Sequence, residues 1–193
     1  MAEERDEELV RRTLDGDRAA FTVLVRRHER RVYSIALRML GRAEDASDAS
    51  QDAFLTAFTK LDRFRGEAAF STWLHRVTVN ACYDILRKRT RQPMLHAVGD
   101  DQLLPEPGPP VPDHAHQVAG ALDARVALGL VPEEFRAALI LADVEDLPYE
   151  EISAILQIPL GTVKSRVHRG RIALAGAMGW EPKASPEPSE ESP

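Results

Sequence analysis

The chain has 193 residues, with 25 Lys or Arg against 31 Asp or Glu, so its formal net charge is −6. This length suits one medium domain or two small ones, and the single cysteine, Cys82, excludes an internal disulfide and fits a reducing cytoplasm. Because there is no apolar run of about 18 residues and no signal-peptide pattern at the start, we expect neither membrane insertion nor export.

Residues 7–91 are predicted to form a first block of four helices. The first helix ends near Gly16, and Asp17 is placed to cap the second. The third spans about 43–61, and the fourth runs from about 71 to 91 after a loop at 62–70. The side chains expected to face inward from the second and third helices are Phe21, Leu24, Val25, Val32, Ile35, Ala36, Met39, Ala46, Ala49, Ala53, Phe54, Ala57, Phe58 and Leu61.

The third helix of this block carries an acidic face. Asp45, Asp48 and Asp52 follow one another at i, i+3 and i+7, with Gln51 beside them, so their side chains share one side of the helix. No His or Cys joins them, which argues against a metal site. A solvated face is the ordinary interpretation of such a run, and we favour a docking surface for a basic partner.

The fourth helix combines cations, an amide and an aromatic ring on one face. Arg76, Asn80, Tyr83 and Arg87 fall at i, i+4, i+7 and i+11. Three aromatic side chains lie on or beside the preceding loop: Phe64, Phe70 and Trp73. Cations interleaved with aromatics suit a nucleic-acid single strand whose bases stack on rings, although a core role alone explains Phe70 and Trp73 well.

A non-helical segment, residues 92–116, follows the first block. It holds six of the 13 prolines, and its four acidic residues are accompanied by no Lys or Arg after Gln92, so we expect a flexible, acidic linker. His114 and His116 lie in it, and together with the helical Cys82 they lack the spacing of a zinc site. The tail, residues 179–193, is rich in Pro, Ser and Glu and is expected to be disordered.

Residues 117–178 are predicted to form a second block of four helices, in which Pro132, Pro148 and Pro159 each open a helix. Since no alternating strand pattern occurs anywhere, the predicted fold class is all-α, with two small helical domains. The last two helices are short and joined by a tight turn, which is typical of a helix-turn-helix.

The last helix has an apolar stripe and a basic side. Leu160, Val163, Val167, Gly170 and Leu174 recur at helical spacing, and Gly170 would let a neighbouring helix approach closely. No acidic residue occurs between Pro159 and Trp180. The residues on the other positions are Thr162, Lys164, Ser165, Arg166, His168, Arg169 and Arg171. A run of charges is often only solvated, but its single sign and its place after a tight turn favour contact with the DNA major groove.

Together these segments resemble the extracytoplasmic-function sigma factors of bacterial RNA polymerase, of the sigma-70 family, over about residues 6–178. The resemblance is carried by four segments in the family's order: DAFLTAF at 52–58, FRGEAAFSTWLHRVTVNACYD at 64–84, LPYEEISAIL at 147–156 and PLGTVKSRVHRGR at 159–171.

The resemblance implies a role in promoter-specific transcription initiation, without a catalytic site, cofactor or small-molecule substrate. Residues 7–91 would be region 2, which binds the polymerase clamp through Asp45, Asp48, Gln51 and Asp52 and melts the minus-ten element. Residues 117–178 would be region 4, which touches the polymerase flap. The implied minus-ten contacts are Phe64, Arg65, Gly66, Phe70, Trp73, Arg76, Asn80, Tyr83 and Arg87. The implied minus-35 contacts are Thr162, Lys164, Ser165, Arg166, His168, Arg169 and Arg171. An anti-sigma factor is a further implied partner.

Two other functions stay open at this point. A free-standing regulator would use only the terminal helix-turn-helix and would leave the first block without a role. A metal-dependent nucleic-acid hydrolase would need Asp45, Asp48 and Asp52 to act together.

Overall fold

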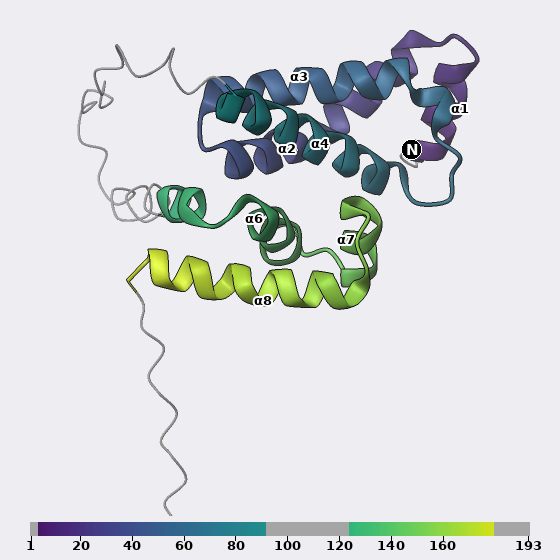
Figure 1. Cartoon of the computed structure of the whole chain (residues 1–193). Helices are drawn as coiled ribbons and strands as arrows, with labels where there is room; N and C mark the ends of the chain where they lie inside the picture. The colour runs from purple at the N-terminus through teal and green to yellow at the C-terminus, as the bar shows by residue number, and fades with distance from the viewer. Residues whose placement is uncertain (1–3, 92–123, 180–193) are drawn as a thin grey trace, which may run out of the picture.

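The computed structural model describes residues 4–91 and 124–179, and every regular element in these two ranges is a helix (Figure 1). This confirms the all-α fold class. The predicted linker, with His114 and His116, and the tail beyond Gly179 lie outside the described residues. None of the helices in the described ranges is long and apolar enough to cross a membrane.

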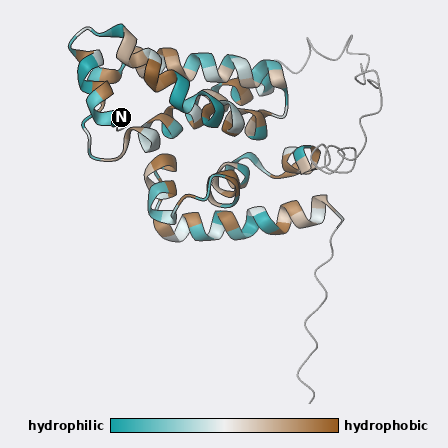
Figure 2. Ribbon diagram, turned by 180° about the vertical axis from the view of Figure 1, so that it is seen from behind, coloured by the Kyte–Doolittle hydropathy of each residue, from teal (hydrophilic) through white to brown (hydrophobic). Residues whose placement is uncertain are grey.

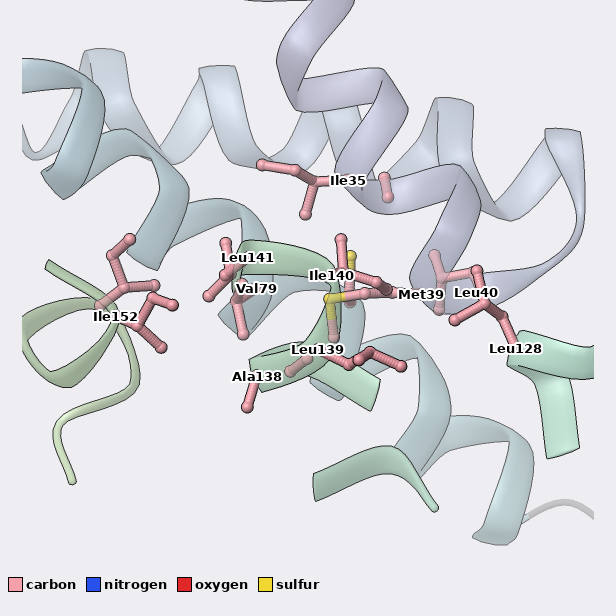
Figure 3. Packing of buried hydrophobic residues seen from close by; sticks show 14 of the residues in the cluster. Ile35, Met39, Leu40, Val79, Leu128, Ala138, Leu139, Ile140, Leu141 and Ile152 are labelled. Atoms are coloured by element: carbon pink, nitrogen blue, oxygen red, sulfur yellow. The ribbon is translucent and has the colours of Figure 1, made fainter. Parts of the chain in front are cut away.

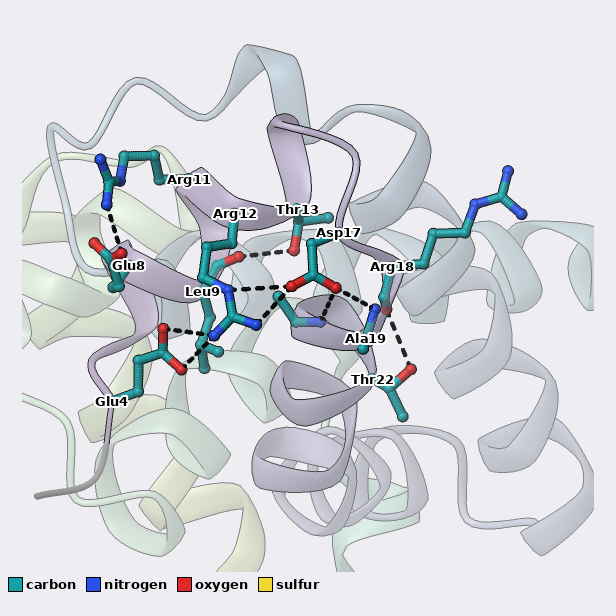
Figure 4. Close-up of polar contacts among 11 residues, drawn as sticks. Glu4, Glu8, Leu9, Arg11, Arg12, Thr13, Asp17, Arg18, Ala19 and Thr22 are labelled. Atoms are coloured by element: carbon teal, nitrogen blue, oxygen red, sulfur yellow. Dashed lines mark hydrogen bonds and ion pairs between the residues drawn. The ribbon is translucent and has the colours of Figure 1, made fainter. Parts of the chain in front are cut away.

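The first unit consists of α1 to α4. Its elements are α1 (Asp6–Leu14), α2 (Arg18–Leu40), α3 (Ala43–Thr59), the short 3₁₀ helix η1 (Leu61–Arg63) and α4 (Phe70–Arg91). The predicted boundaries are confirmed to within two residues. As expected, Asp17 caps α2: its Oδ1 accepts hydrogen bonds from the backbone amides of Ala19 and Ala20 at 2.9 and 3.3 Å (Figure 4).

A network of ion pairs fixes α1 against the start of α2 (Figure 4). The Arg12 guanidinium donates to both Glu4 carboxylate oxygens at 2.8 Å and to Asp17 Oδ2 at 2.5 Å. The hydrogen bond from Arg12 holds the pKa of the Asp17 carboxyl below its usual value. Asp17 therefore remains ionised and available as a cap over most of the pH range.

The predicted core of the first unit is confirmed except at Phe58 and, in part, at Phe54. Ala46, Ala49, Ala53 and Ala57 are fully buried, so α3 lies close to α2 and α4. Phe58, expected to face inward, is 41% exposed and stacks edge-on against Phe21 with ring centroids 5.0 Å apart. Phe58 lies beside the line of buried alanines, and the helix ends one residue later at Thr59; Leu61 of η1 is buried as predicted.

The second unit consists of residues 124–179. Residues 124–130 are helical, and they are followed by α6 (Glu133–Leu139), η2 (Ile140–Val144), α7 (Tyr149–Leu156) and α8 (Leu160–Ala177). Each of the three predicted prolines immediately precedes its helix. The π-helical winding of η2 is not visible in the sequence pattern.

Gly170 lies where α8 crosses α6, as the apolar stripe predicted. A Cβ atom at Gly170 would lie 3.1 Å from the Phe135 carbonyl oxygen and 3.2 Å from Leu139 Cβ. Val163 and Val167 on the same stripe are buried. The absent side chain therefore sets the spacing between the two helices.

The two units form two layers that pack against each other (Figures 1 and 2). One apolar cluster runs through both layers: Ile35, Met39 and Leu40 of α2 and Val79 of α4 meet residues of the second unit (Figure 3). The second unit's residues labelled there are Leu128, Ala138, Leu139, Ile140, Leu141 and Ile152. A core shared by the two units was not predicted from the sequence.

Candidate nucleic-acid interface

The loop between η1 and α4 is held by a group of three aromatic rings. The rings of Phe64, Phe70 and Trp73 form a triangle: the Phe70 centroid lies 5.8 Å from those of Phe64 and Trp73, and these two are 5.6 Å apart. Gly66 has φ +71°, a left-handed conformation that glycine adopts without strain. The loop therefore turns sharply at Gly66, next to the three packed aromatic rings.

Phe70 does not reach the surface, which corrects its place among the predicted nucleic-acid contacts. Its ring is 1% exposed and belongs to the core of the first unit. Phe64 and Trp73 pack against this core but remain half-buried, so parts of both rings face solvent. Phe70 thus positions the two rings that are available for stacking.

A cavity of about 440 Å³ opens beside these rings. It is lined by Phe64, Arg65, Gly66, Trp73 and Arg76, all predicted contact residues. The volume lies within the range typical of small-molecule sites, roughly 300–1,000 Å³. Arg63 lines it as well, so the structure brings an aromatic wall, a glycine turn and three cations together around a space suited to one planar ligand.

A second, larger groove of about 570 Å³ lies between α3 and α4. The predicted residues Trp73, Arg76, Asn80 and Arg87 line it. Three further cations, Lys60, Arg63 and Lys88, also line it, against two acids, Asp52 and Asp84.

Sequence analysis missed Lys60 and Arg63 because they belong to a different helical element from α4. In the sequence, the one indication was that these two basic residues lie on either side of residue 61, where the third helix was predicted to end. The groove is rich in cations and is lined by the half-buried ring of Trp73, which matches the requirements of a single strand.

Tyr83 does not lie on the open face of α4 that was predicted for it. It packs against the cluster shared by the two units and lines neither cavity. Burial raises the pKa of the Tyr83 phenol, and the nearby Arg166 cation of α8 opposes that shift. Asn80, three residues earlier, is exposed. The second unit thus covers one edge of the predicted face and leaves the other open.

The helix-turn-helix is formed by α7 and α8. The turn between them contains Gln157 with φ +55°, and the Ser153 hydroxyl donates to the Ile158 carbonyl at 2.6 Å. Lys164, Ser165, His168 and Arg169 are exposed on the predicted face of α8, whereas Thr162 and Arg166 are half-buried.

Two arginines of α8 already have partners within the second unit. Arg171 donates to both Asp143 carboxylate oxygens, at 2.9 and 2.6 Å, which raises its pKa above the ordinary arginine value. The Arg169 guanidinium lies 5.9 Å from the centroid of the Phe135 ring. Arg171 is therefore more suited to holding α8 in place than to reading a base.

The predicted acidic face of α3 is formed, but Asp45 differs from its neighbours. Asp45 is half-buried and forms ion pairs with Arg89 of α4 and, at 3.9 Å, with Arg42. Asp48, Gln51 and Asp52 are exposed. All four predicted residues nevertheless line one shallow groove, in which the cations Lys88 and Arg89 also lie. Within the described ranges no three His, Cys, Asp or Glu residues are grouped to hold a metal ion.

An apolar groove of about 600 Å³ lies next to this face, between α2 and α3. Val25, Tyr33 and Phe54 line it, together with Gln51 of the acidic face. Phe54 was expected in the core, but it packs only its inner side there. Apolar surface bordered by acids is typical of a protein-docking site.

Comparison with known proteins places both units in one family. Sigma-70 region 2 matches residues 24–92, and Sigma-70 region 4 matches residues 122–174. The ECF RNA polymerase sigma factor SigM of Mycobacterium tuberculosis is 39% identical over 178 residues, covering 92% of this chain and 87% of SigM. The chain belongs to the extracytoplasmic-function sigma factors.

Other similar proteins agree with this membership. The ECF sigma factor SigE of Mycolicibacterium smegmatis is 41% identical over 159 residues, which cover 81% of this chain and 62% of SigE. The sigma factor RpoE from Bartonella quintana, solved in complex with the anti-sigma factor NepR, shares the fold with a TM-score of 0.66 and 24% identity, covering 84% of this chain and 98% of RpoE. The first unit is therefore a sigma region 2 and the second a sigma region 4.

Proposed function

We propose that this sigma factor gives bacterial core RNA polymerase its promoter specificity, without a catalytic site of its own. In this proposal α8 reads the minus-35 duplex, the loop and outer face of α4 hold the melted minus-ten strand, and α3 docks on the polymerase clamp. The observation that supports it most is the groove between α3 and α4, where five cations, Asn80 and Trp73 lie beside the aromatic cavity.

The minus-ten site would bind bases that have already left the duplex and would not itself pull the strands apart. A base that leaves the stack can enter the cavity beside Phe64 and Trp73, where stacking contributes roughly 1–3 kcal/mol. Lys60, Arg63 and Arg76 would hold the phosphates on either side, and the exposed Asn80 amide can donate to or accept from a base edge. Because only a separated strand fits, binding here shifts the duplex toward melting.

The minus-35 site would be α8. Lys164 and Arg169 are exposed at successive turns, and Ser165 lies between them. Lysine and arginine at these positions can reach phosphates or guanine edges in the major groove. The net charge of −6 on the whole chain disfavours unaided binding to DNA, so the polymerase would supply much of the affinity.

The polymerase would dock on the exposed side chains of Asp48, Gln51 and Asp52 together with the apolar groove of Tyr33 and Phe54. We propose the flap as a second contact for the second unit, and an anti-sigma factor as a further partner, since a sigma factor of the same fold was solved with one. With these partners, the proposed location of the protein is the cytoplasm.

Run-off transcription with purified core polymerase tests the proposal. The protein should direct new transcripts that share two upstream motifs. Asn80→Ala should reduce promoter opening, followed by permanganate reactivity of unpaired thymines, while polymerase binding in gel filtration is retained. The exposed α2 variant Thr22→Ala is the matched control and should behave like the unmodified protein. Duplex binding without polymerase at a two-fold symmetric operator would instead establish the free-standing regulator.

A further inference from the structure

The outward face of α8 carries cations in its first half and an apolar side chain in its second. Lys164, His168 and Ile172 follow one another at i, i+4 and i+8, so they share one side of the helix, and all three are exposed. Arg169 is exposed next to them. Figures 1 and 2 show α8 on the outer side of the second layer. Since α8 contains no acidic residue, nothing on the helix itself offsets this positive charge.

The backbone changes direction where α8 ends. Gly179 follows the cap residue Met178 and has φ +69°, and its amide donates to the Gly176 carbonyl at 3.1 Å. A left-handed residue at this place is a common helix ending, because it provides donors for the last carbonyls and turns the chain off the helix axis. Whatever follows Gly179 therefore starts beside the last turn of α8.

Residues 180–193 lie beyond the described part of the chain, and their sequence is complementary to the outward face of α8. They contain four glutamates against one lysine, a net charge of −3, and Trp180 is their one aromatic residue. Ile172 and Met178, at the same end of the helix, are 60% and 56% exposed. The segment thus begins apolar and continues acidic, and the face of α8 has the matching order when it is followed back from its C-terminal end.

The segment is also long enough to reach the cations of α8. Lys164 lies 15 residues before Gly179, which corresponds to roughly 22 Å along the helix axis. Four of residues 180–193 are prolines, and an extended Pro-rich chain covers roughly 3.1 Å per residue, so eight residues span roughly 25 Å. The glutamates that lie eight or more residues beyond Gly179, called the distal glutamates here, are Glu187, Glu190 and Glu191.

We propose that residues 180–193 dock on the outward face of α8 and compete there with duplex DNA. Trp180 would cover Ile172, and the distal glutamates would lie opposite Lys164 and Arg169, where DNA phosphates would otherwise bind. Each exposed ion pair is weak, but a short tether gives the segment an effective concentration in the millimolar range, so several pairs together suffice. The competition rests on the proposed function of α8, whereas the docking does not.

Such a competitor would act mainly against unrelated DNA. Non-specific binding depends almost entirely on phosphate contacts, which carboxylates on the same cations exclude. A specific site adds contacts to base edges in the major groove, and a peptide carboxylate does not replace those. The docked segment would therefore lower the affinity of α8 for random sequence more than its affinity for a promoter element.

Paramagnetic broadening of amide signals tests the docking without DNA. A nitroxide on Ser189→Cys, in a Cys82→Ala background, lies between the distal glutamates. At about 50 mM salt, where surface charges are weakly screened, it should broaden the amide signals of residues 164–172. Glutamine at all three distal glutamates should restore these signals. Sharp α8 signals before that replacement, or broadening along α4 instead, would overturn the docking.

A control variant separates the docking from a general change in charge. It carries three exposed glutamates of the first unit replaced by glutamine, so its net charge changes by the same amount as in the distal-glutamate variant. The three replacements are Glu7→Gln, Glu29→Gln and Glu44→Gln. In this control the α8 signals should stay broadened, and their recovery would overturn the docking.

Fluorescence anisotropy with a labelled duplex of about 20 base pairs and mixed sequence tests the competition, because such a probe reports phosphate contacts. The distal-glutamate variant should bind on the order of tenfold more tightly than the unmodified protein, with a steeper dependence on salt because more phosphates are contacted. An affinity no higher than that of the first-unit control would overturn the competition. If no variant binds the duplex although the α8 signals respond, DNA binding by α8 fails while the docking stands.

Discussion

Replacing Gly170 by alanine tests the close approach of α6 and α8, on which the position of the helix-turn-helix depends. Gly170 is buried in the middle of α8, and its missing side chain faces the Phe135 carbonyl and Leu139. Gly176 of the same helix is exposed and has no atom within 4 Å of the place a Cβ would occupy. The two glycines therefore differ in their surroundings while sharing a helix.

Helix propensity and steric crowding act in opposite directions on the change in the free energy of unfolding. Alanine is favoured over glycine in a helix by roughly 1 kcal/mol, and by less near a frayed end. At Gly176, one residue before the last of α8, we expect a gain of about 0.5 kcal/mol. At Gly170 a new methyl group 3.1 Å from a backbone oxygen forces the helices apart, and overpacking costs typically 1–3 kcal/mol. The expected net change for Gly170→Ala is a loss of about 1 kcal/mol.

Urea unfolding followed by circular dichroism at the helix band measures both variants, with the midpoint and slope fitted together. Gly176→Ala should raise the midpoint slightly, and Gly170→Ala should lower it, so the free energies of unfolding should differ by about 1.5 kcal/mol. If Gly170→Ala is stabilised as much as Gly176→Ala, the helices are not in close contact at this point and the crossing of α6 and α8 is wrong.

Three further predictions concern buried polar groups. Burial, with the nearby charges of Arg31 and His28, lowers the pKa of His75 from 6.5 to about 4. Between these two pH values the unfolded chain binds a proton that the folded chain does not, so the free energy of unfolding should fall by about 3 kcal/mol between pH 6.5 and pH 4. His75→Leu should remove this loss of stability in urea titrations repeated at several pH values. If the variant loses as much stability over this pH range as the unmodified protein, the assignment to His75 is wrong. Arg136→Met should lower the free energy of unfolding by about 3 kcal/mol in the same assay, because it leaves the backbone carbonyls that Arg136 contacts buried without a donor. If Arg136→Met lowers the free energy of unfolding no more than the exposed Arg11→Met does, this reasoning is refuted. Burial raises the pKa of the Cys82 thiol to about 12; a thiol reagent at pH 8 should therefore label it only after unfolding, and rapid labelling of the native protein would show that α4 is not covered.

Much of the local structure was predictable from the sequence because capping and periodicity act within a few residues. Asp17 and the three prolines fixed where helices begin, and the stripe through Val163, Val167 and Gly170 fixed which side of α8 is buried. The acidic face of α3 and the exposed Asn80 follow from the same spacing. Phe58 was misplaced because only the line of Ala46, Ala49, Ala53 and Ala57 on α3 is buried, and Phe58 lies beside that line.

The sequence by itself determined the all-α class, the helix boundaries and the sides of the helices that carry charge, since these depend on neighbours along the chain. Only the tertiary structure decided that Lys60 and Arg63 join the groove of α4, that Phe70 supports the stacking rings from beneath, and that Tyr83 is covered. Arg136 would be taken for a solvated cation in the sequence, yet it is buried on the end of another helix. Burial removes water from a group only when distant segments pack over it, and local periodicity does not specify which segments those are.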